Sequence, residues 1–168
     1  MTATEITSHR LVLPADANHH GTLYAGSLLR YALESAYAAA SRAAGPDANL
    51  VLRRVLSLEC RRAVPVGTLV ELRAAVLQAR RGYLVTGVVG LDAHGPGPAV
   101  DGPPWMDGLF GFAQVDAAGL PAELPRAVEP VSGSTLWQPL VDRLEKLAAI
   151  RAATAGWVVA TPSRPGPG

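Results

Sequence analysis

The stretch of residues 16–44 constrains the fold of this chain more than any other part of its sequence. It opens as a polar loop, and from about Leu23 its apolar residues recur at spacings of three and four, the period of one helical face. Most of these residues are alanines, whose small side chains let a helix approach a sheet closely. Gly45 and Pro46 follow as an end signal, and Thr22 or a neighbour is expected to cap the start. The apolar positions are Leu23, Leu28, Leu29, Ala32, Leu33, Ala36, Ala39, Ala40 and Ala43. A helix wrapped by a curved sheet is therefore expected.

Strand-like runs, in which Val, Leu and polar residues roughly alternate, dominate the chain after Asn49. A short strand is also expected before the helix. Because turn sequences separate several of the runs, the neighbouring strands are expected to be antiparallel. The predicted strands cover residues 5–13, 50–64, 69–79, 83–91 and 109–115. One strand, a long helix and four further strands predict an α+β fold.

The chain of 168 residues is long enough for one domain with a substantial core. We place that domain at residues 1–130, followed by a helical extension at 131–160 and a disordered tail at 161–168. Residues 94–107 are rich in Gly and Pro, which indicates an irregular insertion between two strands. Trp105 and Met106 at its end are expected to fold back over an apolar surface.

Composition excludes several classes of function. The formal net charge is +1, which favours neither nucleic acid nor an anionic membrane as a partner. Cys60 is the single cysteine, and no ligand spacing indicates a metal. The sequence starts without a basic segment leading into an apolar one, and no apolar run is long enough to span a bilayer. A soluble cytoplasmic protein is expected.

Three motifs in this sequence resemble those of the hotdog-fold acyl-CoA thioesterases. The first is the D-A-N-x-x-G-x-L-x-x-G pattern of residues 16–26, which continues along the helix to Glu34 and Ala36. The second is A-V-P-V-G-T-L-V-E at residues 63–71, and the third is F-A-Q-V-D-x-x-G-x-P at 112–121 with its Leu-Pro tail. The resemblance spans roughly residues 11–125. It implies a helix wrapped by a sheet, two protomers joined edge to edge, and active sites at the interface between them.

The start of the helix suits thioester chemistry. Backbone amides around Tyr24, Ala25 and Gly26 supply donors and a partial positive charge for an oxyanion. Glu34 lies eight residues beyond Gly26, or about 12 Å along a helix. At that distance the helix-start amides and Glu34 of one chain cannot act on the same carbonyl carbon. Either the acid comes from a second protomer, or the acting residue lies in the loop. We favour a composite site across a twofold axis.

Two residues compete for the catalytic role that the resemblance implies. Asn18 matches a loop position that holds water or the thioester, and Glu34 matches a helix position that supplies a general base or nucleophile. Each residue also has a possible role that is only structural. Asn18 could form an Asx turn, and Glu34 could form an exposed ion pair with Arg30 on the helix surface. Arg80 and Arg81 are candidate contacts for coenzyme A phosphates. No cofactor is expected, because coenzyme A belongs to the substrate.

The leading hypothesis is a homodimeric or larger thioesterase that hydrolyses an acyl-CoA or acyl-carrier-protein thioester. Counted from the helix-start glycines, the aspartate of one family branch falls on Leu33. A second hypothesis is therefore a non-catalytic protein that binds or scaffolds acyl thioesters. A hotdog hydratase or dehydratase ranks lower, because the histidine, phenylalanine and proline-glycine run of those enzymes is missing before the helix.

Overall fold

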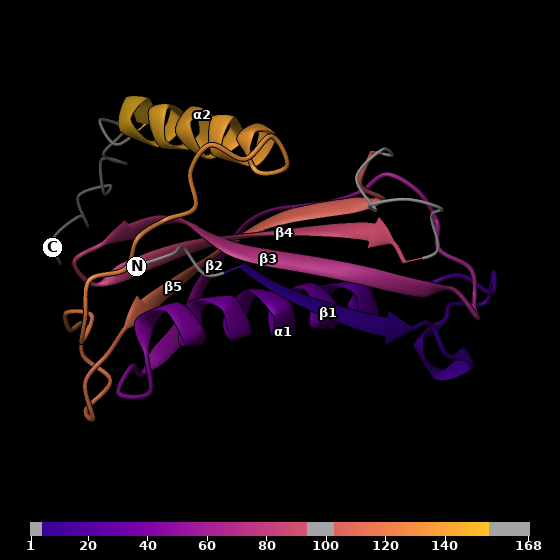
Figure 1. Ribbon diagram of the computed structural model, residues 1–168, viewed down its shortest axis with the longest axis horizontal. Coiled ribbons are helices and arrows are strands. Elements are labelled where there is room, and N and C mark those ends of the chain that lie inside the picture. Colours follow the sequence, from indigo (N-terminus) through magenta and orange to yellow (C-terminus); the bar gives the residue numbers. More distant parts are fainter. Residues whose placement is uncertain (1–4, 94–102, 155–168) are drawn as a thin grey trace, which may run out of the picture.

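The computed structural model describes residues 5–93 and 103–154, which form one five-stranded sheet with a long helix on each side (Figure 1). The strand order is β1-β3-β4-β5-β2, and every neighbouring pair is antiparallel. The strands are β1 (Glu5–Leu11), β2 (Leu50–Cys60), β3 (Leu69–Arg80), β4 (Tyr83–Asp92) and β5 (Met106–Gln114). The helices are α1 (Ala25–Ala44), α2 (Gln138–Thr154) and a short 3-10 turn, η1 (Pro14–Asp16). This arrangement confirms the predicted α+β class, with a long central helix against an antiparallel sheet and an added C-terminal helix.

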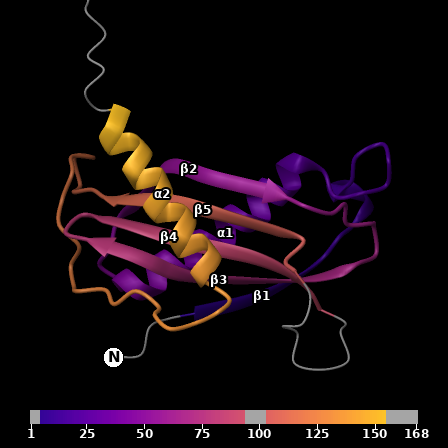
Figure 2. The ribbon, with the colours of Figure 1, turned by 90° about the horizontal axis from the view of Figure 1, so that it is seen from above.

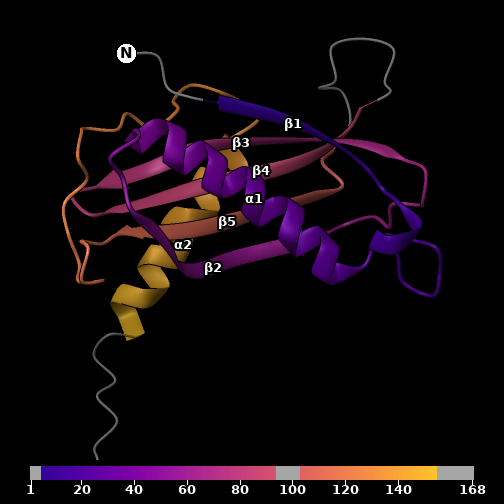
Figure 3. The same cartoon turned by 90° about the horizontal axis from the view of Figure 1, so that it is seen from below.

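The alanine-rich face of α1 packs against one side of the sheet, as the sequence predicts. Figure 3 shows α1 crossing the strands diagonally on this side. The fully buried alanines of this face are Ala32, Ala36, Ala39, Ala40 and Ala44. Leu29 lies at the margin of the face and remains 37% exposed. Because small residues line the contact, the helix axis approaches the strands closely over the length of α1.

α2 lies over the other face of the sheet (Figure 2), and a second cluster of buried apolar side chains fills the space between them. Trp137, Leu140 and Leu144 are buried against the outer face of the strands. Gly87 makes room for Leu140 and for Leu77 of β3, because a Cβ there would lie 2.6 Å from Leu77 Cδ1 and 3.1 Å from Leu140 Cδ1. Polar contacts also fix α2: Trp137 donates its indole N–H to Glu5 at 2.9 Å. Arg143 also donates to the buried carboxylate of Asp107, at 2.6 Å.

Several element boundaries differ from the sequence prediction. β1 ends at Leu11 and β2 at Cys60, before the predicted ends at residues 13 and 64. β5 begins at Met106, three residues before the predicted start, because Trp105 is buried and joins the strands on both sides. The Trp105 N–H donates to Gly90 O, and its carbonyl accepts from the Arg61 N–H. The prediction that Trp105 folds onto an apolar surface is confirmed. Residues 94–102 of the predicted insertion and the predicted tail at 161–168 lie outside the described residues.

The C-terminal helix begins at Gln138, seven residues after the start of the helical extension expected at 131–160. The N–H groups of Trp137 and Gln138 both donate to Ser134 O, forming a turn before the helix. Pro139 then occupies the first turn, where its missing N–H breaks no helical hydrogen bond. Among the described residues, neither helix is long and apolar enough to cross a membrane.

Candidate functional site

The start of α1 presents backbone donors for which the described part of the chain supplies no acceptor. Tyr24 is the N-cap residue, with extended backbone angles and no side-chain hydrogen bond to the helix. The Leu28 N–H donates to Tyr24 O, but within the described residues no acceptor is found for the N–H of Ala25, Gly26 or Ser27. The predicted cap at Thr22 does not form. The first turn therefore holds three neighbouring donors and the positive end of the helix dipole.

One of the three predicted oxyanion donors is already engaged. The Tyr24 N–H donates to Asp16 O at 2.8 Å and so ties the start of the helix to η1. The donors available to a ligand are thus those of Ala25 and Gly26, with Ser27 beside them. The Tyr24 ring, which is 56% exposed, lies over Gly26: a Cβ on Gly26 would be 2.5 Å from Tyr24 Cε1. The lack of a side chain at Gly26 lets this ring cover the helix start.

Asn18 organises the loop before the helix. Its side-chain oxygen accepts from the backbone N–H of His20 at 2.9 Å and of Thr22 at 3.3 Å. Its side-chain nitrogen donates to the Thr22 hydroxyl at 3.1 Å. Gly21 completes the turn with a positive φ of 72°. An amide nitrogen carries two N–H groups, so Asn18 retains one donor beyond those the loop uses.

Glu34 lies at a different place, in a cavity of about 390 Å³ between α1 and β1. The cavity is lined by His9, Arg10, Leu11, Leu13, Asp16, Arg30, Tyr31 and Glu34. Oε2 of Glu34 accepts from Arg10 Nη2 on β1 in an ion pair. Arg30 instead bonds Asp16, so the helix pair between Arg30 and Glu34, considered as a structural alternative, is not the contact found here.

The same cavity contains a polar cluster around the buried Asp16 and Tyr31, which the sequence analysis did not predict. Asp16 is 8% exposed and accepts from Arg30 Nη2 at 2.7 Å. Burial raises the pKa of the Tyr31 phenol, and a hydrogen bond with Asp16 and its negative charge raise that pKa further. The guanidinium groups of Arg10 and Arg30 lie 5.5 Å and 5.4 Å from the Tyr31 ring centroid. Asp16 and Arg30 are 14 residues apart across a loop, so no helical spacing signals their contact.

The two sides of α1 differ in character. Consecutive helical residues point about 100° apart, so Leu33 and Glu34 face different neighbours. Leu33 packs against the main apolar core, and Tyr37 meets Phe112 of β5 edge to face at 5.8 Å. Glu34 instead meets Arg10 of β1. The polar side of the helix thus faces β1, whereas the side towards β5 and the outermost strand β2 is apolar.

Arg80 and Arg81 lie at the opposite end of α1 from its free amides. Arg81 pairs with Glu123, and nearby Arg126 donates to the carbonyls of Arg42 and Ala43 in the last turn of the helix. A helix of 20 residues is about 30 Å long. Within one chain the structure therefore does not bring Arg80 or Arg81 to the start of α1, just as Glu34 stands apart from it.

Comparisons with known proteins identify the fold. No protein-family model and no curated protein matches this sequence. An acyl-CoA hydrolase from Staphylococcus aureus, solved with butyryl coenzyme A, coenzyme A and coenzyme A disulfide, matches with a TM-score of 0.69 and 20% identity over 90% of this chain and 85% of that one. An acyl-CoA hydrolase from Bacillus cereus matches with a TM-score of 0.68 and 18% identity, covering 90% of this chain and 87% of the other.

A third solved structure, an apo-hexameric acyl-CoA thioesterase, matches with a TM-score of 0.68 and 22% identity, over 92% of this chain and 94% of that one. The expected hotdog fold is thereby confirmed. At these identities the likeness is one of fold.

Proposed function

We propose that this protein hydrolyses an acyl thioester of coenzyme A, or of an acyl carrier protein, to a free acid and a thiol. The observation that carries the proposal is the set of N–H groups at the start of α1 that have no acceptor among residues 5–93 and 103–154. The fold in which they occur is also that of acyl-CoA hydrolases, one of them solved with butyryl coenzyme A.

The amides of Ala25 and Gly26 would bind the thioester carbonyl oxygen. Attack on the carbonyl carbon places a negative charge on this oxygen, and two N–H donors at the positive end of a helix stabilise that charge. One such donor typically contributes a factor of about 10² to 10³ in rate. The exposed Tyr24 ring over Gly26 would form the adjacent wall for the acyl group or the thiol arm.

Asn18 and Glu34 would supply the remaining groups. The spare amide N–H of Asn18 orients the carbonyl or the attacking water. Glu34 Oε2 is held by Arg10, whereas Oε1 has no partner among the described residues and is the oxygen that takes the proton from water. The resulting tetrahedral intermediate then expels the thiolate, which is protonated to the thiol, leaving the acid.

The separation of these groups within one chain leads us to a homo-oligomeric site. Gly26 and its own Glu34 are about 12 Å apart along the helix, so Glu34 of the partner subunit would act at each helix start. The β2 edge is the surface we assign to this contact. β2 is an outermost strand, and it exposes Val51, Leu52 and Val55 at 39%, 42% and 44%. Two chains joined there by a twofold axis have antiparallel α1 helices. Because Glu34 faces β1 and Arg10, on the side of α1 away from β2, its carboxylate would act on a subunit that meets the β1 side of the helix in a larger assembly.

The arginines at the other end of the helix fit the same assembly. Arg80 or Arg81 would contact coenzyme A phosphates only from a neighbouring subunit, because about 30 Å separates them from the amides of their own α1. Arg81 already pairs with Glu123, which leaves Arg80 as the better candidate of the two.

One observation favours a second candidate, an acyl-thioester binding protein without turnover. The Asn18 oxygen and one Asn18 N–H are used by the loop, Glu34 is paired with Arg10, and its neighbour Leu33 is apolar. If Asn18 and Glu34 serve only these structural contacts, the amides at the helix start would still bind a thioester, but no group would activate water to cleave it.

Thiol release and binding, measured on the same preparation, separate the two candidates. Release from an acyl-CoA supports the hydrolase. Saturable binding of the acyl-CoA without release supports the binding protein instead.

A further inference from the structure

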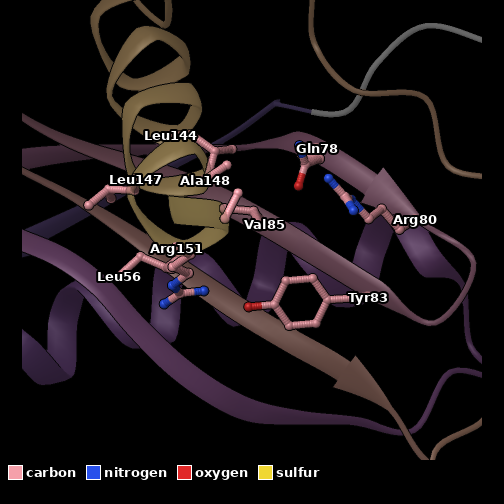
Figure 4. A pocket seen from close by; sticks show the side chains of 10 residues that line it. Leu56, Gln78, Arg80, Tyr83, Val85, Leu144, Leu147, Ala148 and Arg151 are labelled. Carbon is pink, nitrogen blue, oxygen red and sulfur yellow. The ribbon is translucent and has the colours of Figure 1, made fainter. Parts of the chain in front are cut away.

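A second cavity lies on the opposite side of the sheet, between α2 and the outer face of the strands (Figure 4). It has a volume of about 410 Å³, within the range of roughly 300 to 1,000 Å³ that small-molecule sites occupy. We call it the α2 pocket. It is lined by Leu56, Gln78, Arg80, Tyr83, Val85, Leu144, Leu147, Ala148, Arg151 and Ala152.

The α2 pocket has an aliphatic part. Leu144, Leu147 and Ala148 of α2 lie across from Val85 of β4 and Leu56 of β2. These side chains offer no hydrogen-bonding group, so this part of the pocket suits a hydrocarbon chain.

Apart from Ala152, the remaining lining residues are polar, and the charged ones among them are arginines. Gln78, Arg80 and Tyr83 make no side-chain hydrogen bond or ion pair with any residue in the described part of the chain. Arg151 of α2 lines the same cavity as Tyr83 (Figure 4). Arg80 makes no ion pair with the described residues, and the lining includes no carboxylate, so the charge of this part of the pocket favours an anion.

The shape of the pocket depends on a glycine in β5. A Cβ on Gly111 would overlap the hydroxyl and ring of Tyr83, so the missing side chain lets this ring lie across the strand. Tyr83 thereby forms part of the cavity lining and directs its hydroxyl into the space beneath α2.

We infer that the α2 pocket binds a small amphipathic carboxylate, with its aliphatic tail between α2 and the sheet and its carboxylate at Arg80. A guanidinium recognises a carboxylate through two parallel N–H bonds, and Tyr83 and Gln78 add further donors beside it. The aliphatic walls favour an alkyl tail over the flat ring of a nucleotide. Such an acid is also the product of the proposed hydrolysis, but its binding here needs no turnover.

Calorimetric titration with decanoate tests this inference on the full chain. Three reference ligands separate the contributions: acetate has the head without the tail, decyltrimethylammonium has the tail with the opposite charge, and adenosine monophosphate is an anion with a flat ring. We expect saturable binding of decanoate alone. Arg80→Gln is expected to weaken it about tenfold, the typical value of a charged hydrogen bond. Lys146→Gln, which removes an exposed charge from α2 outside the pocket, is expected to leave binding unchanged.

Leu147→Trp fills the aliphatic part and is expected to abolish binding, with circular dichroism showing that α2 is retained. Methyl NMR shifts on decanoate addition should concentrate at Val85 and Leu147 and spare Leu28 on the α1 side. The inference is overturned if decanoate does not bind, or if Arg80→Gln and Lys146→Gln bind it equally. It is also overturned if shifts appear only on the α1 side, or if Leu147→Trp changes the mass of the assembly and leaves decanoate affinity intact.

Discussion

Glu34 on α1 is held by an ion pair with Arg10 on β1 of the same chain. This contact directs the carboxylate towards β1, whereas the adjacent Leu33 packs into the apolar core. Glu34 therefore has an evident structural partner as well as a proposed catalytic role, and the two roles predict different behaviour for substitutions at the two ends of the pair.

Glu34→Gln is expected to lower the rate of thioester hydrolysis by about 100-fold or more, the contribution of a general base. Both side chains of the pair are more than 40% exposed, so the free energy of unfolding should fall by less than about 1 kcal/mol. Arg10→Gln is the matched control: it breaks the same pair and retains the carboxylate. Equal activities for the two variants would assign Glu34 to structure alone.

Ala25→Pro is expected to remove one oxyanion donor without harming the helix. Proline suits the first helical position, and Tyr24 before it already has the extended ψ of 141° that a following proline requires. The free energy of unfolding should stay constant or rise by up to about 1 kcal/mol. Hydrolysis should fall about 10² to 10³-fold. Ala25→Gly keeps the N–H and should retain most activity; a fully active proline variant would exclude this amide from the reaction.

Two substitutions of Asn18 separate its hydrogen bonds within the loop from its proposed hydrogen bond to the substrate or water. Asn18→Ala removes the acceptor for the His20 and Thr22 amides and should cost about 1 kcal/mol of stability. Asn18→Asp keeps that acceptor, so thermal unfolding should stay near that of the wild type. Both variants lose the amide donor, and both should hydrolyse more slowly. If only the alanine variant is slow, Asn18 acts by holding the loop.

The raised pKa of Tyr31 predicts that the protein loses stability at alkaline pH. Its folded pKa is raised above the ordinary value of about 10, so above that pH the unfolded chain loses the Tyr31 proton before the folded protein does. The stabilisation from this phenol is present below pH 10 and declines as pH rises through the folded pKa. Denaturant unfolding between about pH 9 and 11.5 should therefore show a shallower loss of stability in Tyr31→Phe. Parallel curves for the two proteins would show that Tyr31 titrates normally.

The β2 edge is expected to be the main contact between protomers. Val55→Lys places a charge on this edge and should shift the mass measured by light scattering towards the monomer. Val66→Lys is the control, because Val66 is 38% exposed and lies outside the strands. A wild-type protein that is monomeric at micromolar concentration would remove the basis for a composite site.

The architecture was predictable because periodicity and turn signals depend on local sequence. The alanine face of α1 and the alternation in β3 and β4 gave element types and approximate limits. The start of β5 was missed because tertiary packing of Trp105, between β4 and the segment after β2, extends the strand beyond its apolar run. Local propensity carries no information about such a contact.

The candidate site was only partly predictable for the same reason. A helix start is visible in a sequence, so the free amides near Gly26 could be located. The contacts of Glu34 with Arg10 and of Asp16 with Arg30 join separate elements, and only the fold reveals them. The α2 pocket was likewise inaccessible, since Arg80 and Arg151 come together only when α2 lies on the sheet.

The first experiment is thiol release from a panel of short, long and aromatic acyl-CoA thioesters, with a thiol-reactive dye, by the wild-type protein and by Ala25→Pro. We expect turnover of at least one thioester by the wild type, and a loss of about 10² to 10³-fold in the folded proline variant. Binding of acyl-CoA with no release from any thioester, acyl-carrier-protein substrates included, would contradict hydrolysis and leave a thioester-binding protein.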